Sequence, residues 1–410
     1  MKNKLSFLQM MLWIFCVTFF VYQYGVRSAV PNVLNEELRN SFSIGATQMG
    51  TLISLFYFAY TIMQIPVGLL IDRYNPKKIA IFAFACVSLG TIMFVTTNSY
   101  LIAAVSQLFL GFGCSFAFVL VMKITNDVFP KERVALFSSI AISCGSLGPV
   151  IMSPLLAYLS QLYYWKNVVI LFGSLGFLFS LSGALLLKKC EVTGECEIDN
   201  SNLNIRDSLS EIISNPQYLF IGAFSMLMLG PVSAFCDAWG LTFIKSVYDI
   251  DKVHAASVVS MVYIGTIIGG PILACIAEKC NSYKKVMLGG GILLFVLIDI
   301  LIFIKLNIYV LYVLLFVIGI VATSQFLAFP AAISMVDKKV GGTLTGVVNT
   351  ITMLGCTIMA PSVGWCIDFF DTDGVYTAID YQNGMMILLA SVAAAIIAAA
   401  CIKDRKISGK

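Results

Sequence analysis

The chain has 410 residues, of which 59% are hydrophobic and 12% are charged. A soluble domain carries about twice that share of charge, so the composition excludes a water-soluble globule and indicates a membrane protein. The net charge of +4 would suggest an acidic partner if the basic residues were evenly spread along the chain. They are not, and their distribution instead reports orientation in a bilayer.

Twelve apolar runs are long enough to cross a bilayer, which requires about 20 residues each. Because lipid offers no hydrogen-bond partners, the backbone groups of each run must be satisfied within it, and the runs are expected to be helices. We therefore predict an all-α membrane protein. Its twelve transmembrane helices are expected at residues 7–34, 45–70, 79–97, 99–122, 134–159, 167–187, 216–244, 254–276, 286–304, 307–335, 342–368 and 383–402.

Lysine and arginine are distributed unequally between alternate loops. With both termini inside, 20 of the 26 basic residues lie on the inner side, five lie on the outer side, and Arg27 lies within a span. Such an excess marks the cytoplasmic face of a membrane protein. We therefore expect a multi-pass protein of the cell inner membrane with both termini in the cytoplasm.

Two sequence patterns recur at a nearly constant offset. The charged stretch GLLIDRYNPKK at residues 68–78 returns in altered form as ACIAEKCNSYKK at residues 274–285, an offset of 206 residues. The dipeptide Leu-Gly, with a proline six residues after the glycine, occurs at residues 147–154 and again at 354–361, an offset of 207 residues. Two repeats at one offset predict a duplicated half, as in transporters built from internal repeats.

The longest polar stretch separates the two copies. Residues 188–215 shift to acidic and small residues, which is typical of a linker. Its last part, residues 206–213, has isoleucine and leucine at helical spacing, which predicts a short helix on the inner membrane surface. We therefore expect two pseudo-symmetric six-helix bundles, at residues 1–187 and 216–410, joined by a cytoplasmic linker.

The charged loop after the second span resembles the signature loop of the major facilitator superfamily. The family's pattern is roughly G-x-x-x-D-R-x-G-x-K-K, and it is matched at Gly68, Asp72, Arg73, Lys77 and Lys78. The resemblance implies two bundles related by an axis along the membrane normal, with spans 1, 4, 7 and 10 around a central cavity. A basic cytoplasmic loop of some other polytopic protein is the alternative.

The same loop residues are expected to act in gating. Asp72 and Arg73, with the two lysines that follow, would stabilise the outward-open state, and Glu278 and Lys279 occupy the equivalent place in the second half. An exposed ion pair is worth about 1 kcal/mol or less, yet that suffices to bias a near-balanced equilibrium. Asn75 stands where the family has its second glycine, and asparagine tolerates a left-handed backbone better than any residue except glycine.

Charged residues inside apolar spans are the main functional candidates, because a charge in a bilayer is costly. Arg27 lies toward the outer end of the first span, close to Tyr24 in the sequence. Its planar guanidinium could make two hydrogen bonds to a substrate carboxylate. We therefore assign Arg27 and Tyr24 to substrate binding. Alternatively, Arg27 could extend to the outer headgroups or form a structural pair.

Asp237 lies in the seventh span, the repeat equivalent of the first. The repeat offset aligns it with Val30 or Pro31, so Asp237 and Arg27 are expected at similar depth in facing helices. Burial favours the neutral form of a carboxyl group, which makes Asp237 a candidate for proton coupling. A static ion pair or a lone aspartate near the outer water is the alternative. Asp299 in the ninth span is a weaker candidate, because the family resemblance implies that spans 3, 6, 9 and 12 are peripheral.

Uncharged polar residues form a further candidate set. Gln107 in the fourth span and Gln325 in the tenth could line a substrate cavity. Gln107 stands where the family's second motif, R-x-x-x-G, carries arginine, so a proton mechanism through that arginine is not expected here. The alternative for both glutamines is helix packing.

Other functional classes lack their motifs. The single histidine, His254, excludes an H-E-x-x-H metalloprotease, and without a Walker loop an ATP-driven pump is not expected. The sequence also lacks the cluster of His, Asp or Glu at one depth that a membrane-embedded enzyme requires. We expect no enzymatic activity, no cofactor, no metal site and no nucleic-acid partner.

The combined interpretation is a secondary active transporter that moves an amino acid or an organic anion by alternating access with proton-coupled uptake. Arg27 ahead of a proline is similar to the organic-anion symporters of the family, whereas the arginine-to-proline spacing of four favours the phagosomal amino-acid and nucleoside transporters of intracellular bacteria. An efflux antiporter for drugs or metabolites is the alternative. The expected partners are a small-molecule substrate, protons and the lipid bilayer, and the chain is expected to be a monomer.

Overall fold

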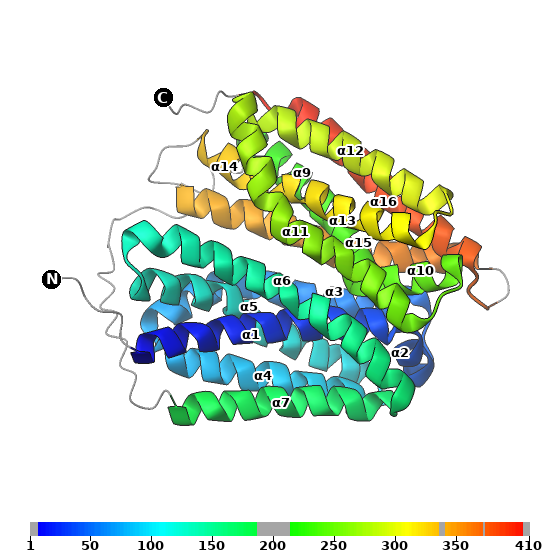
Figure 1. Cartoon of the computed structure of the whole chain (residues 1–410), viewed down its shortest axis with the longest axis horizontal. Coiled ribbons are helices and arrows are strands. Elements are labelled where there is room, and N and C mark those ends of the chain that lie inside the picture. The colour runs from blue at the N-terminus through cyan, green and yellow to red at the C-terminus, as the bar shows by residue number, and fades with distance from the viewer. Residues whose placement is uncertain (1–6, 187–213, 336–340, 372–373, 405–410) are drawn as a thin grey trace. The chain divides into compact units, whose positions relative to one another are not determined.

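The computed structural model describes residues 7–186, 214–335, 341–371 and 374–404. These residues form long helices joined by short turns (Figure 1). The first half contains α1 (Phe7–Val33), α2 (Asn35–Phe42), α3 (Ala46–Arg73), α4 (Pro76–Thr96), α5 (Tyr100–Val128), α6 (Lys131–Leu162) and α7 (Trp165–Leu186). The second half contains α9 (Pro216–Ala234), η1 (Phe235–Trp239), α10 (Gly240–Tyr248), α11 (Lys252–Cys280), α12 (Tyr283–Phe303), α13 (Ile308–Ala322), η2 (Thr323–Leu327), α14 (Ala328–Ile333), α15 (Gly341–Phe370) and α16 (Ala378–Cys401).

The helices have the length and hydropathy of membrane spans. In the described part of the chain, eleven spans are long and apolar enough to cross a bilayer. The pair formed by α2 and the first part of α3, which is bent by 107°, brings the number to twelve when it is counted as one span. The predicted all-α membrane protein with twelve helices is therefore confirmed. The short helix predicted at residues 206–213 lies outside the described residues.

Tertiary contacts divide the chain into two units. Unit 1 comprises residues 1–42 and 55–199, and unit 2 comprises residues 43–54 and 200–410. The first turns of α3 therefore cluster with unit 2, whereas the rest of the helix clusters with unit 1. The predicted linker, residues 188–215, falls almost wholly outside the described residues, so the predicted domain boundaries stay predictions.

The predicted internal repeat is visible in the glycine contacts between helices, which occur at equivalent positions in the two units. In unit 1, a Cβ atom on Gly148 of α6 would lie 2.1 Å from the carbonyl oxygen of Val21 in α1. In unit 2, a Cβ atom on Gly355 of α15 would lie 2.3 Å from the carbonyl oxygen of Met226 in α9. Both sites accept only glycine, because a side chain would force the two backbones apart. The Leu-Gly repeat of the sequence thus marks the same helix crossing in each unit.

A second pair of glycines repeats in the same way. A Cβ atom on Gly111 of α5 would lie 2.2 Å from the carbonyl oxygen of Phe56 in α3, and one on Gly319 of α13 would lie 2.1 Å from that of Val262 in α11. Gly111 and Gly319 are separated in the sequence by almost the same number of residues as Gly148 and Gly355. Each unit is therefore assembled by the same close helix crossings, as expected for duplicated halves.

The turn that follows α3 differs from its predicted geometry. Asn75 is not left-handed, since its φ is −59°, and it serves instead as the N-cap of α4. Its side-chain oxygen accepts a hydrogen bond from the backbone N–H of Lys77 at 3.0 Å. Asparagine suits this position because it is among the best N-cap residues. The left-handed asparagine occurs in the second half, where Asn281, with φ 49°, ends α11.

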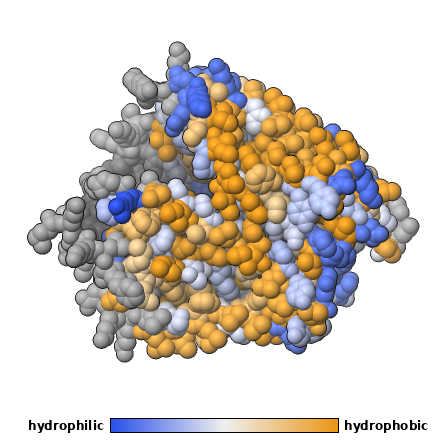
Figure 2. All heavy atoms as spheres, in the orientation of Figure 1, coloured by the Kyte–Doolittle hydropathy of each residue, from blue (hydrophilic) through white to orange (hydrophobic). Residues whose placement is uncertain are grey.

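The surface is apolar along the helices. Figure 2 shows orange hydrophobic residues over most of the face in view, with blue hydrophilic residues mainly near helix ends. Leu101, Tyr309 and Ile397 illustrate the pattern, since each large apolar side chain is 67 to 78% exposed. Such a surface is stable against lipid and not against water. The chain is therefore a multi-pass membrane protein.

Candidate functional site

A glycine contact places Arg27 on the side of α1 that points away from α6. Gly148 of α6 packs against the backbone of α1 at Val21 and Gly25. A helix turns about 100° per residue, so Gln23 and Arg27, two residues before and after Gly25, lie on nearly the opposite side. One face of α1 therefore packs against α6, and Gln23 and Arg27 project from the other side of the helix.

The Arg27 guanidinium is surrounded by aromatic rings. Its central carbon lies 4.2 Å from the ring centroid of Tyr24, one turn earlier in α1. The rings of Tyr57 and Phe56 in α3 are 5.6 and 5.7 Å away. Cation–π contacts of this kind contribute about 0.5 to 2 kcal/mol, and more as the cation is removed from water. The predicted pair of Arg27 and Tyr24 is therefore brought together, and the rings from α3 are added to it.

Other polar side chains of unit 1 are deeply buried. Gln23 is 2% exposed, and the predicted cavity residue Gln107 is 5% exposed in α5. Gln23 was not among the functional candidates predicted from the sequence. The signal that could have found it is its spacing of four residues from Arg27, which places both on one helix face.

Asp237 lies in a break in the helical geometry. Residues Phe235–Trp239 form a π-helix between α9 and α10, and the backbone N–H of Gly240 donates to the carbonyl of Phe235. A Cβ atom at Gly240 would lie 2.5 Å from that carbonyl oxygen, so glycine permits the wider turn. Single π-turns are frequent at functional sites. The sequence showed the charge but not the π-turn that presents it.

The carboxylate of Asp237 is buried and receives two hydroxyl donors. Its side chain is 4% exposed. Tyr263 of α11 donates to one carboxylate oxygen at 2.6 Å, and Ser233 of α9 donates to the other at 2.9 Å. Such donors stabilise a carboxylate that has left water. The Ser-x-x-x-Asp spacing could have indicated Ser233, whereas Tyr263 comes from a different helix and could not be predicted.

The tenth span has a second break in unit 2. Residues Thr323–Leu327 form a 3-10 segment between α13 and α14, and the predicted cavity residue Gln325 lies within it. The Gln325 side-chain oxygen accepts a hydrogen bond from Ser225 of α9 at 2.8 Å. Asp299 is half-buried in α12 and is not part of this contact. Gln325 is therefore held by α9, the same helix that leads to Asp237.

The predicted gating residues lie at helix ends. Asp72 and Arg73 are the last two residues of α3, and the structure does not describe their side chains. Gly68 precedes them with open space where a Cβ would point. The remaining members lie in the first turn of α4 (Lys77 and Lys78) and in the exposed last turn of α11 (Glu278 and Lys279).

Arg27 and Asp237 belong to different units, Arg27 to unit 1 and Asp237 to unit 2. Within their own units each is held by a separate set of neighbours, aromatic rings for Arg27 and hydroxyl groups for Asp237. Whether the two side chains face each other, as the sequence predicts, stays a prediction.

Asp368 is a polar residue that the sequence analysis missed. At the end of α15 it accepts hydrogen bonds from the backbone N–H groups of Ala46 and Thr47 at 3.0 and 2.8 Å, and from the Thr47 hydroxyl at 2.5 Å. Tyr376 donates to the same carboxylate at 2.6 Å. Asp368 therefore caps the N-terminus of α3 across more than 300 residues, where a negative charge is favourable. A separation this large leaves no local sequence signal.

The repeated helical halves and the charges inside apolar helices are the architecture of a secondary transporter. A family model described as Major Facilitator Superfamily matches residues 15–360 and 233–407. The chain therefore belongs to the Major Facilitator Superfamily, whose members are membrane transporters and not enzymes. The resemblance seen at Gly68–Lys78 is confirmed.

Several relatives share segments of this chain. A transporter of Bacillus subtilis named YybO, described as uncharacterized, is 27% identical over 39% of this chain and 37% of its own length. The probable galactarate/D-glucarate transporter GarP of Escherichia coli is 30% identical over 42% of this chain and 39% of its own length. The probable sulfoacetate transporter SauU of Cupriavidus necator is 25% identical over 46% and 43%. The matched region thus spans less than half of each relative.

Solved structures share the fold over nearly the whole chain. A bacterial homolog of the human lysosomal transporter Spinster, in an inward-facing and occupied conformation, has a TM-score of 0.76 at 15% identity and covers 95% of both chains. The nucleoside transporter NupG has a TM-score of 0.76 at 13% identity, covering 95% of this chain and 99% of that one. At such low identity these matches establish the fold and nothing further.

Proposed function

We propose that the chain is a secondary active transporter that takes up a small organic anion by alternating access. The single observation that carries the proposal is the Arg27 guanidinium, held inside an apolar helix by Tyr24 and by two rings of α3. A cation kept at such cost in a membrane helix is suited to bind an anion.

The relatives support an anionic substrate. GarP and SauU are named as probable transporters of galactarate or D-glucarate and of sulfoacetate, all of which are small organic acids. Among the two groups that the sequence resembles, this favours the organic-anion symporters over the amino-acid and nucleoside transporters. Tyr24 and Gln107 are proposed to complete the binding site with Arg27, and Gln325 to contribute from the tenth span.

Asp237 is the proposed proton-coupling residue. Its burial inside a membrane helix supports this role, because ionisable residues kept in such helices often belong to proton or ion pathways. Asp299 is proposed only as a secondary coupling candidate, since it is half-buried. The loop residues at Gly68–Lys78, with Glu278 and Lys279, are proposed to gate the cytoplasmic side.

The proposed orientation in the membrane rests on the distribution of basic residues between alternate loops. We propose that the transporter works as a monomer in the inner membrane, with both termini in the cytoplasm and protons as the coupling ion. Drug or metabolite efflux remains the second candidate, and the buried acidic residue Asp237 is the observation that favours it, because exporters of organic cations require a negative cavity.

Counterflow in proteoliposomes loaded with D-glucarate or sulfoacetate tests the anion site. Replacing Arg27 with lysine keeps the charge but loses the two-pronged geometry, so the KM should rise about tenfold. Replacing Arg27 with alanine should raise it about a hundredfold, because a hydrogen bond to a charged group contributes about 1.5 to 3 kcal/mol and the pair has two. Arg133→Ala, which removes an exposed arginine of α6, is the matched control and should behave as wild type. An unchanged anion KM in Arg27→Ala would contradict the proposal, and wild-type exchange of organic cations alone would favour efflux.

A further inference from the structure

Gln23 has a buried carbonyl oxygen that no described residue satisfies. Its side chain is 2% exposed, and its Oε1 atom has no hydrogen-bond donor among the described residues. A buried polar group left without a partner destabilises the folded protein. Such groups are uncommon in native structures, and one in a helix of a transporter calls for a functional reason.

The orientation of the Gln23 amide is fixed by its other end. The Nε2 atom donates to the carbonyl oxygen of Phe20, one turn earlier in α1, at 3.3 Å. Rotating the amide by half a turn would set two carbonyl oxygens against each other, so the arrangement with Nε2 toward Phe20 is the stable one. The carbonyl end of the Gln23 amide is therefore the end that has no partner among the described residues.

Gln23 and Arg27 lie one turn apart on the same face of α1. Residues four apart on a helix have Cβ atoms about 5 to 6 Å from each other. The carboxylate of a 2-hydroxy acid and the hydroxyl on its neighbouring carbon are close enough to be bound by two side chains at this spacing. The Arg27 fork suits the carboxylate, and the Gln23 oxygen suits the hydroxyl hydrogen, because it can only accept.

We propose that Gln23 is a specificity-determining residue that accepts a hydrogen bond from a hydroxyl group beside the substrate carboxylate, so that the transporter selects 2-hydroxy acids. The inference rests on the proposed function of Arg27 as the carboxylate site. A site built to bind a hydroxyl discriminates against the analogue that lacks it, because the buried acceptor is then left unpaired.

Paired substrates that differ only in hydroxyl groups test this role. Counterflow of malate is compared with that of succinate, and of D-glucarate with that of adipate, in proteoliposomes of wild type and Gln23→Met. Methionine has a similar volume and no strong acceptor. The wild type is expected to favour the hydroxylated member about three- to tenfold in KM, the factor that one hydrogen bond supplies. Gln23→Met should reduce that ratio to near one, because the hydroxyl then has no acceptor to bind.

The control is Gln382→Met, a glutamine of α16 whose amide donates to the carbonyl of Ile302 at 3.0 Å. It should keep the wild-type preference. Thermal unfolding of detergent-solubilised wild type adds a second readout that needs no variant, since malate should raise the Tm more than succinate does. If Gln23→Met keeps the wild-type ratio, or weakens both members of each pair equally, or if malate and succinate raise the wild-type Tm equally, Gln23 does not read the hydroxyl. Transport of no organic anion by wild type would instead overturn the proposed function itself.

Discussion

At the residue scale, two charged residues inside apolar helices have different kinds of neighbour. Arg27 contacts aromatic rings, whereas Asp237 accepts hydrogen bonds from hydroxyl groups. The first charge is the proposed anion-binding group and the second is the proposed proton-coupling group. Both charges could be located from the sequence because they interrupt apolar runs. Their partners could not, because Tyr57 and Tyr263 come from other helices.

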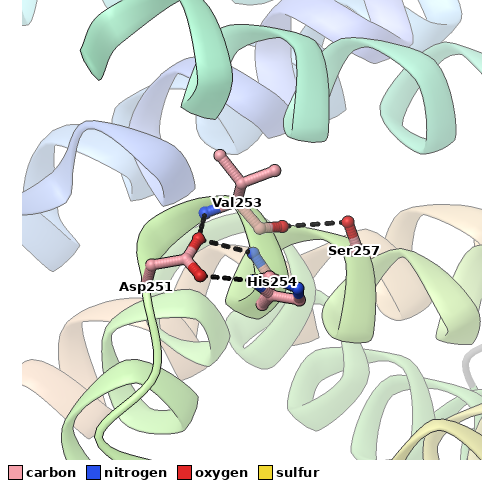
Figure 3. A network of polar contacts seen from close by, with 4 residues as sticks. All are labelled: Asp251, Val253, His254 and Ser257. Carbon is pink, nitrogen blue, oxygen red and sulfur yellow. Dashed lines mark hydrogen bonds and ion pairs between the residues drawn. The ribbon is translucent and has the colours of Figure 1, made fainter.

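Asp251 provides a residue-scale test outside the spans. It is the N-cap of α11, where its carboxylate accepts from the backbone N–H groups of Val253 and His254 and contacts the His254 ring (Figure 3). The His254 ring contact and these N–H groups hold the pKa of Asp251 below its usual value of 3.8. A lowered pKa means that the carboxylate adds stability above about pH 4 and that this contribution is lost as the pH falls below it.

Asp251→Asn should therefore remove this acid sensitivity. Asparagine is an equally good N-cap, so the variant keeps the helix start and loses only the titration. Thermal unfolding in detergent from pH 3 to pH 6 should show a smaller fall in Tm for the variant than for wild type. The effect is expected to be small, at most about 1 kcal/mol, since the pair is half-exposed. Parallel curves for the two proteins would show that Asp251 does not contribute.

At the element scale, the ordinary helices could be predicted from the sequence and their irregular segments could not. A long apolar run in a bilayer can satisfy its backbone groups only as a helix. The number and order of the spans therefore follow from the positions of the apolar runs in the sequence. The π-turn at Asp237, the 3-10 turn at Gln325 and the bend before α3 depend on how neighbouring helices pack. Asn75 shows the same limit, because one residue type suits both an N-cap and a left-handed turn, and the sequence alone favoured the wrong one.

The Asp368 cap allows a test of how the start of α3 is held in unit 2. Asp368→Asn removes the charge and one acceptor from the three hydrogen bonds to Ala46 and Thr47, so this helix start should be weakened by about 1 to 2 kcal/mol. Hydrogen exchange of the amides at residues 46–50 should be roughly ten times faster in the variant than in wild type.

Asp371→Asn is the matched control for this substitution. Asp371 lies three residues further on and accepts a hydrogen bond from the backbone of Gly374 at 2.9 Å, so the amides at the start of α3 should exchange at the wild-type rate. Unchanged exchange at residues 46–50 in Asp368→Asn would mean that the carboxylate does not secure α3.

At the scale of the whole molecule, duplication accounts for most of what the sequence could predict. The Leu-Gly repeat predicted two similar halves, and Gly148 and Gly355 occupy equivalent crossings in their units. The proposed functional residues do not follow the repeat, since Arg27 has no basic counterpart in the seventh span and Asp237 has no acidic counterpart in the first. One half is thus proposed to bind the anion and the other to carry the proton, a division of labour that symmetry alone could not predict.

The most direct test of this account is the uptake of radiolabelled D-glucarate into proteoliposomes under an inward proton gradient. Wild type should accumulate the anion above its external concentration, and a protonophore should abolish the accumulation. Asp237→Asn should lose accumulation but retain exchange of internal for external anion, because the binding site is intact and only coupling is lost. If wild type takes up organic anions equally with and without the gradient, or if Asp237→Asn accumulates them as wild type does, the proposed coupling through Asp237 is wrong.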